Sequence, residues 1–143
     1  MNETTLNTQE TVKIYPDDHT TLLTSHANQF RESYQISNSN AHQVRTRQRN
    51  LITEEFKEFL EAEALLYLTS SKPKEDCLKE LADLVYVCYQ YAVNMGWNLD
   101  EAMYRVHESN MSKLDGEGNP IYREDGKVLK GPNYKPPDLS DLI

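Results

Sequence analysis

The chain is short of basic residues and has no long apolar run. Lys and Arg number 15 against 23 Asp and Glu, which gives a formal net charge of -8. Non-specific binding to DNA or RNA depends on clustered cations that neutralise phosphates, so we expect no polymeric nucleic acid among the partners. No apolar stretch approaches the ~18 residues of a membrane-spanning helix, and no signal-peptide pattern is present. We therefore expect no membrane association and a cytoplasmic location, in the host cytoplasm if the source is viral.

Cysteine and clustered histidine are scarce as well. Cys77 and Cys88 are eleven residues apart in one expected helix, where they cannot form a disulfide with each other. No Glu-x-x-His pair occurs, which argues against a carboxylate di-iron bundle. Hydrophobic residues make up 38% of the 143 residues. Because this content is modest for a monomer, we expect a homodimer or homotetramer whose interface completes the core.

Helical periodicity covers most of the chain. It predicts an all-α fold resembling a four-helix bundle, with helices at about residues 21–35, 41–68, 73–95 and 99–114. Pro73 suits the first turn of the third helix and Gly96 suits its C-cap, while Asn98 has a glutamate three residues later, as in a capping box. The side chains expected to pack inward from the third helix are Leu78, Leu81, Leu84, Val85, Cys88 and Ala92.

Three segments make up one expected domain. Residues 1–20 form a polar N-terminal extension rich in Thr and Asn, which we interpret as docking on a neighbouring subunit. Residues 21–115 form the helical bundle. Residues 116–143 combine a small β-hairpin around Asp125-Gly126 with a Pro-rich tail, which cannot be helical.

Acids occupy helix positions where a packed core requires apolar groups. In the second expected helix, Glu55 and Glu58 lie in the middle of a stripe that begins and ends with apolar residues. In the third, Glu80 and Asp83 are three residues apart, and Asp83 interrupts the apolar run LADLV. Acids are rarely buried unless they are paired or bind a metal. Four such carboxylates on two packed helices would repel one another, and about two divalent cations would neutralise them.

Carboxylate oxygens favour Mg²⁺ or Mn²⁺ over Zn²⁺. A magnesium site built of carboxylates usually holds substrate phosphates, whose remaining charge lysines can balance. Asn110 and Lys113 share one face of the fourth helix and suit this role. The predicted substrate-binding residues are Asn110, Lys113, Lys130, Tyr134 and Arg47. In contrast, we interpret Glu54, Glu61 and Glu63 as solvated charges on the helix surface.

Residues of about 40–139 resemble the MazG-like nucleotide pyrophosphohydrolases of the all-α NTP pyrophosphatase superfamily. The resemblance is carried by the segments LITEEFKEFLEA, KELADLVYV and SNMSKLDGEGNPIYREDGKVLKGPNYKPPDL. The acidic signature of that family, EExxE followed by ExxD, is matched at positions 54–58 and 80–83. The resemblance implies a dimeric or tetrameric helical enzyme. It also implies Mg²⁺-dependent cleavage of a nucleoside triphosphate to the monophosphate and diphosphate.

The same resemblance implies roles for individual residues. Asn110 and Lys113 match an Asn-x-x-Lys expected to contact sugar or phosphate. Glu55 or Glu58 would assist as the base when water attacks a phosphorus. The implied metal ligands are Glu55, Glu58, Glu80 and Asp83.

The acidic residues do not identify the substrate. Guanine deoxynucleotides are common substrates among the short viral-type relatives, so we expect dGTP or GTP. The alternative is a phosphoribosyl-ATP pyrophosphohydrolase, an activity found on the same scaffold. An alternative of another class is a non-catalytic helical oligomer that binds nucleotide or protein. The acids argue against this last alternative, because a binding module has no need for four converging carboxylates.

Overall fold

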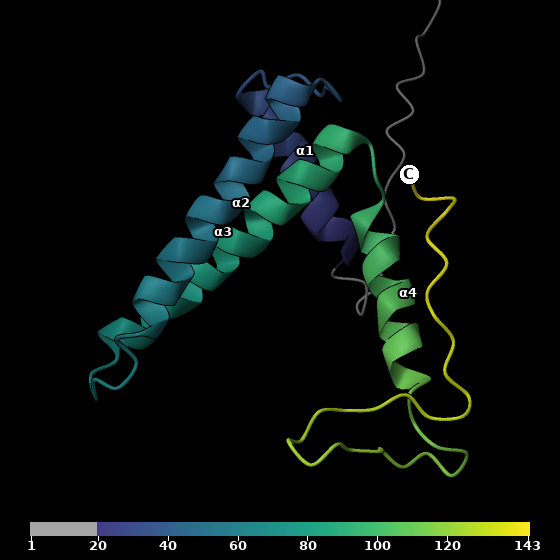
Figure 1. Ribbon diagram of the computed structural model, residues 1–143. Coiled ribbons are helices and arrows are strands. Elements are labelled where there is room, and N and C mark those ends of the chain that lie inside the picture. The colour runs from purple at the N-terminus through teal and green to yellow at the C-terminus, as the bar shows by residue number, and fades with distance from the viewer. Residues whose placement is uncertain (1–19) are drawn as a thin grey trace, which may run out of the picture.

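The computed structural model describes residues 20–143, so the expected docking of the N-terminal extension lies outside the described residues. The helices of the described part are α1 Thr20–Ser33, α2 His42–Glu63, α3 Lys72–Met95 and α4 Leu99–Met111 (Figure 1). The predicted all-α class is confirmed. α2 ends earlier than expected because residues 64–68 tighten into turns closed by i→i+3 hydrogen bonds. None of the helices in residues 20–143 is long and apolar enough to cross a bilayer.

The helices form an open arrangement in place of a closed bundle (Figure 1). α2 and α3 run side by side as a long antiparallel hairpin. α1 packs against both α3 and α4. Among the described helices, the backbone of α2 lies close only to that of α3. No helix of residues 20–143 therefore covers one face of the α2–α3 hairpin.

The end of α3 and the start of α4 follow the sequence-based prediction. Gly96 caps α3 with φ of 73°, a left-handed conformation that glycine adopts without steric strain. The side chain of Asn98 accepts a hydrogen bond from the backbone N–H of Glu101 at 3.1 Å. The carboxylate of Glu101 does not complete a reciprocal capping box, because it binds Nε of Arg105 at 2.9 Å.

The apolar core of a single chain is small. Leu78, Leu81 and Val85, all expected to pack inward from α3, are 68%, 43% and 42% exposed. Phe56 and Leu60 on α2 are also exposed, at 47% and 46%. The buried apolar residues of the described chain are Ala27, Tyr89, Ala92 and Val93. The expected inward stripe of α3 is thus only partly covered within one chain.

The predicted C-terminal hairpin does not form as two strands. A single antiparallel bridge joins Tyr122 and Val128, with Gly126 in the turn at φ of 84°. Two short segments with no covering layer are marginal as a sheet, which explains why pairing stops at one bridge.

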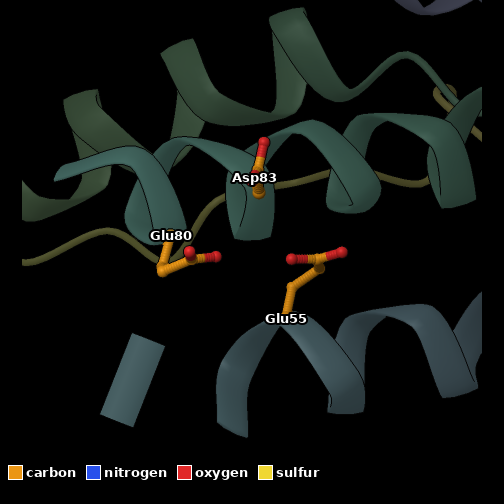
Figure 2. A group of neighbouring side chains, drawn as sticks. All are labelled: Glu55, Glu80 and Asp83. Atoms are coloured by element: carbon orange, nitrogen blue, oxygen red, sulfur yellow. The ribbon is translucent and has the colours of Figure 1, made fainter. Parts of the chain in front are cut away.

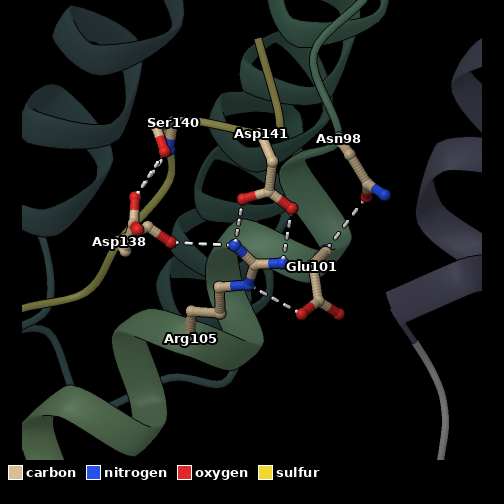
Figure 3. A network of polar contacts seen from close by, with 6 residues as sticks. All are labelled: Asn98, Glu101, Arg105, Asp138, Ser140 and Asp141. Atoms are coloured by element: carbon tan, nitrogen blue, oxygen red, sulfur yellow. Dashed lines mark hydrogen bonds and ion pairs between the residues drawn. The ribbon is translucent and has the colours of Figure 1, made fainter.

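The Pro-rich tail is bound along α4. The guanidinium of Arg105 binds the carboxylate of Asp141, with Nη2 and Oδ2 3.0 Å apart, and donates to the main-chain oxygen of Asp138 at 2.9 Å (Figure 3). The buried Ser109 hydroxyl donates to the main-chain oxygen of Lys135 at 2.8 Å. These contacts place the preceding segment, residues 130–134, at the C-terminal end of α4.

Candidate metal centre

Carboxylates from α2 and α3 meet between the two helices. One oxygen from each of Glu55, Glu80 and Asp83 lies within 4.8 Å of the others (Figure 2). All three side chains are partly buried. A spacing of three residues places Glu80 and Asp83 on one face of α3, and this face is turned toward Glu55 on α2.

Glu58, the fourth predicted ligand, lies at the edge of this group. It is exposed and is not one of the three clustered residues. Glu80 is among the groups that raise the pKa of Glu58, so the two carboxyl groups lie near each other. The structure thus gathers three of the predicted ligands and places the fourth beside one of them.

Two carboxylate oxygens of these residues are buried without a hydrogen-bond donor among the described residues. They are Oε2 of Glu55 and Oε2 of Glu80. A buried anionic oxygen without a donor or cation costs free energy, because it has lost its hydration. Hard carboxylate oxygens are the ligands that Mg²⁺ and Mn²⁺ prefer. The residues between α2 and α3 therefore fit a hard divalent cation.

Lys79 contacts the same acids and is not among the residues predicted from the sequence. Its Nζ lies 3.0 Å from Oε1 of Glu80 and 2.8 Å from Oδ2 of Asp83. Hydrogen bonds, first to Asp83 and then to Glu80, raise the pKa of Lys79 above its usual range. A lysine one residue before the first acid and four before the second reaches both on a helix, so the spacing contained this signal. One ammonium group does not balance four carboxylates, and the centre stays acidic.

Burial and mutual repulsion disfavour the charged form of two of the acids. The pKa of Glu55 is raised mainly by desolvation, and then by the charges of Glu58 and Asp83. The pKa of Glu58 is raised by desolvation and then by Glu80. A carboxyl group with a raised folded-state pKa contributes stability below its unfolded value, here 4.5, and loses it as the pH rises through the folded-state pKa. At neutral pH these acids therefore lower the stability of the metal-free fold.

We expect Glu55→Gln to raise the melting temperature of the metal-free protein at neutral pH, because it removes one repelling charge and keeps the side-chain shape. The difference from wild type should shrink as the pH falls below the ordinary carboxyl range, where the wild-type acids are protonated. Mg²⁺ should raise the melting temperature of wild type more than that of the variant. Circular dichroism melts in EDTA and in Mg²⁺ measure both effects. The matched control is Glu61→Gln, an exposed glutamate on α2, and equal melting temperatures for wild type and Glu55→Gln would contradict the expectation.

Three predicted substrate-binding residues gather at the C-terminal end of α4. The N–H of Gly131 donates to the main-chain oxygen of Lys113 at 2.9 Å, which brings Lys130 next to Lys113. Nζ of Lys130 lies 4.5 Å from the centre of the Tyr134 ring. A Cβ atom on Gly131 would lie 2.6 Å from the main-chain oxygens of Lys113 and Leu114, so this approach requires glycine. An open hollow of about 620 Å³ adjoins Tyr134, a volume within the range of small-ligand sites.

These residues are separated from the acids within one chain. α2 does not contact α4, and Figure 1 shows the C-terminal end of α4 across the open side of the molecule from the α2–α3 hairpin. Asn110 is exposed one turn before Lys113, on α4. Arg47 is exposed on α2, about two turns before Glu55. One chain therefore brings together neither Asn110 and the acids nor Lys113 and the acids.

A model of the phosphoribosyl-ATP pyrophosphohydrolase family matches residues 17–110, which is more than half of the chain. The match includes all four predicted metal ligands and ends at Asn110, so Lys113, Lys130 and Tyr134 lie beyond it. No curated protein matches the chain. The family match favours an enzyme over the alternative of a non-catalytic helical oligomer. The chain belongs to the phosphoribosyl-ATP pyrophosphohydrolase family and is a pyrophosphohydrolase, a hydrolase that acts on acid anhydrides.

Proposed function

We propose that the protein is a MazG-like nucleoside triphosphate pyrophosphohydrolase that uses Mg²⁺, or Mn²⁺ in its place. It converts a nucleoside triphosphate and water to the monophosphate and diphosphate. The observation that carries this proposal is the group of three carboxylates on α2 and α3, two of whose oxygens are buried without a donor. Carboxylate-bound Mg²⁺ in proteins commonly holds substrate phosphates as well. The substrates we propose are dGTP and GTP.

The proposed mechanism assigns separate tasks to the acids. Glu55, Glu80 and Asp83 would hold the cations, which when bound polarise phosphoryl oxygens and lower the pKa of water. Glu58 is the general base, because it is exposed beside the cluster and its raised pKa lies closer to neutral pH. It accepts a proton from the attacking water while the water oxygen bonds to phosphorus and the bond to the leaving phosphate oxygen breaks. Glu55 is the alternative base.

The basic residues would bind the substrate. Lys113 and Lys130 would contact the negative charge of the triphosphate, and Asn110 its sugar or a phosphate. Since α2 does not contact α4 in one chain, we propose that the acids of one protomer and the Lys113 end of another form each site in a homodimer or homotetramer. The exposed apolar side chains of Phe56, Leu60 and Leu81 flank the acids in sequence and support an interface there.

Light scattering should therefore give a dimer or tetramer of 16.6 kDa subunits at micromolar concentration. Mixing two impaired variants tests the shared site. After subunit exchange, a mixture of Asp83→Asn and Lys113→Ala assayed at a substrate concentration below the wild-type KM, where both variants are slow, should regain activity, because a mixed pair of subunits contains one site without either substitution. A fully active monomer would contradict the oligomer, and a mixture no more active than its components would contradict the shared site.

A panel of nucleoside triphosphates with Mg²⁺, scored for monophosphate and diphosphate, tests the activity. Phosphoribosyl-ATP belongs in the panel, because the family match favours it as the second candidate substrate. The highest kcat/KM on dGTP or GTP supports the proposal. A preference for phosphoribosyl-ATP would replace the proposed substrate. If none of the compounds releases diphosphate, the proposed function is wrong.

A further inference from the structure

A buried arginine connects α1, α2 and α3, and no carboxylate of the described residues pairs with it. Arg31 is 3% exposed. Its Nη1 lies 3.5 Å from Oε1 of Gln48 on α2 and 3.4 Å from Oε1 of Gln90 on α3. Nη2 donates to Oδ1 of Asn94 at 3.0 Å and to a main-chain oxygen, and Nε donates to Oδ1 of Asn38 at 2.6 Å. All of its hydrogen-bond partners in the described chain are neutral oxygens.

Burying this charge opposes folding. Desolvation lowers the pKa of Arg31, and no ion pair with a carboxylate of residues 20–143 compensates the lost hydration. An apolar residue would avoid this cost. Only the planar guanidinium fork, however, donates to several oxygens at once in fixed directions. The geometry thus gives Arg31 a specific ability, which is to hold side chains of different helices at set distances from one another.

The Arg31 network and the acids lie along the same facing sides of α2 and α3. Glu55 on α2 lies against Glu80 and Asp83 on α3. Hydrogen bonds from Arg31 bring Gln48 on α2 near Gln90 on α3. Gln48 is seven residues before Glu55 on α2, and Gln90 is seven residues after Asp83 on α3. A separation of seven residues keeps each amide on the same helix face as its acid. Seven residues are two helical turns, or about 10 Å. The amide pair held by Arg31 therefore lies on the same facing stripes as the acids.

The Arg31 network includes the one buried residue of α2. The backbone of this helix lies close to that of α3 alone among the described helices, Arg31 reaches it from α1 by a side chain, and Gln48 is its one buried residue. The side chains of α2 that face α3 beyond Gln48 include Glu55, which repels the acids on the other helix. Repulsion of this kind favours separation of the helices, and the Arg31 network opposes it two turns away.

We propose that Arg31 is a positioning residue for the metal centre. By binding Gln48 and Gln90 together, it sets the placement of α2 against α3 and hence of Glu55 against Glu80 and Asp83. This inference rests on the proposed function, because it requires the acids to bind a divalent cation. None of the acids is among the hydrogen-bond partners of Arg31 in the described chain.

The test is the affinity of the full chain for Mn²⁺ without nucleotide, measured by isothermal titration calorimetry. Arg31→Lys and Gln48→Leu should weaken Mn²⁺ binding by about tenfold or more, the size of effect typical for residues that orient metal ligands. Gln48→Glu should stay within about threefold of wild type, because a carboxylate can still accept from Arg31. Val93→Ala is the control, since this buried residue of α3 lies outside the hydrogen-bond network. It should lower the melting temperature and leave the affinity within about twofold.

The outcomes separate this inference from the function on which it rests. If wild type binds Mn²⁺ and both Arg31→Lys and Gln48→Leu bind it equally well, Arg31 has only a stabilising role and the inference is wrong. Should Arg31→Lys fail to fold, Gln48→Leu and its comparison with Gln48→Glu decide the question. If wild type itself does not bind Mn²⁺, the proposed metal-dependent function is wrong.

Discussion

Asp83→Asn is expected to lower kcat by at least about a hundredfold, while circular dichroism shows intact helices. Asparagine keeps the size of the side chain but removes the negative charge that a hard cation requires. EDTA should abolish the activity of wild type for the same reason. Steady-state rates at saturating Mg²⁺, and again after chelation, measure both effects. Asp76→Asn is the matched control, because Asp76 lies on the same helix but pairs with the exposed Lys72.

A second variant separates the proposed base from the ligands. Glu58→Gln should lower kcat with little change in KM, because a general base acts in the transition state and not in substrate binding. The metal assignment would fail if wild type kept its rate in EDTA, or if Asp83→Asn were as active as Asp76→Asn.

Lys113→Ala is expected to raise KM by about tenfold with kcat nearly unchanged. Lys113 would interact with phosphate charge that is present in the bound substrate and in the transition state alike, and such interactions affect KM alone. The magnitude follows from the ~1.5 kcal/mol or more carried by a hydrogen bond to a charged group, since 1.4 kcal/mol is a factor of ten. Steady-state kinetics with the preferred nucleotide measures it.

Lys74→Ala provides the control for this variant, because Lys74 is an exposed lysine on α3 and not one of the proposed substrate-binding residues. It should leave kcat and KM within about twofold. An unchanged KM in Lys113→Ala would contradict the proposed phosphate contact of Lys113. Lys130 would then be the candidate, because the hydrogen bond from Gly131 to Lys113 places it nearby.

The sequence by itself determined the helices and the separate acid stripes. These features depend on local physics: the 3.6-residue period, the left-handed cap at Gly96 and the side-chain cap at Asn98 act within a few residues. Glu80 and Asp83 must share a face wherever their helix packs, because three residues are nearly one turn. The acids could therefore be named without knowing the tertiary structure.

Only the tertiary structure decided which stripes meet. The approach of Glu55 to Asp83, and the two-turn distance from the acids to the amides held by Arg31, depend on the register between α2 and α3. No local pattern predicts that register, because contacts between residues far apart in sequence set it. The same reason applies to Lys113, which local spacing placed on a suitable helix face but which the fold places away from the acids of its own chain. The predicted hairpin failed for the complementary reason, since a turn signal alone supplies no layer for two short strands to pack against.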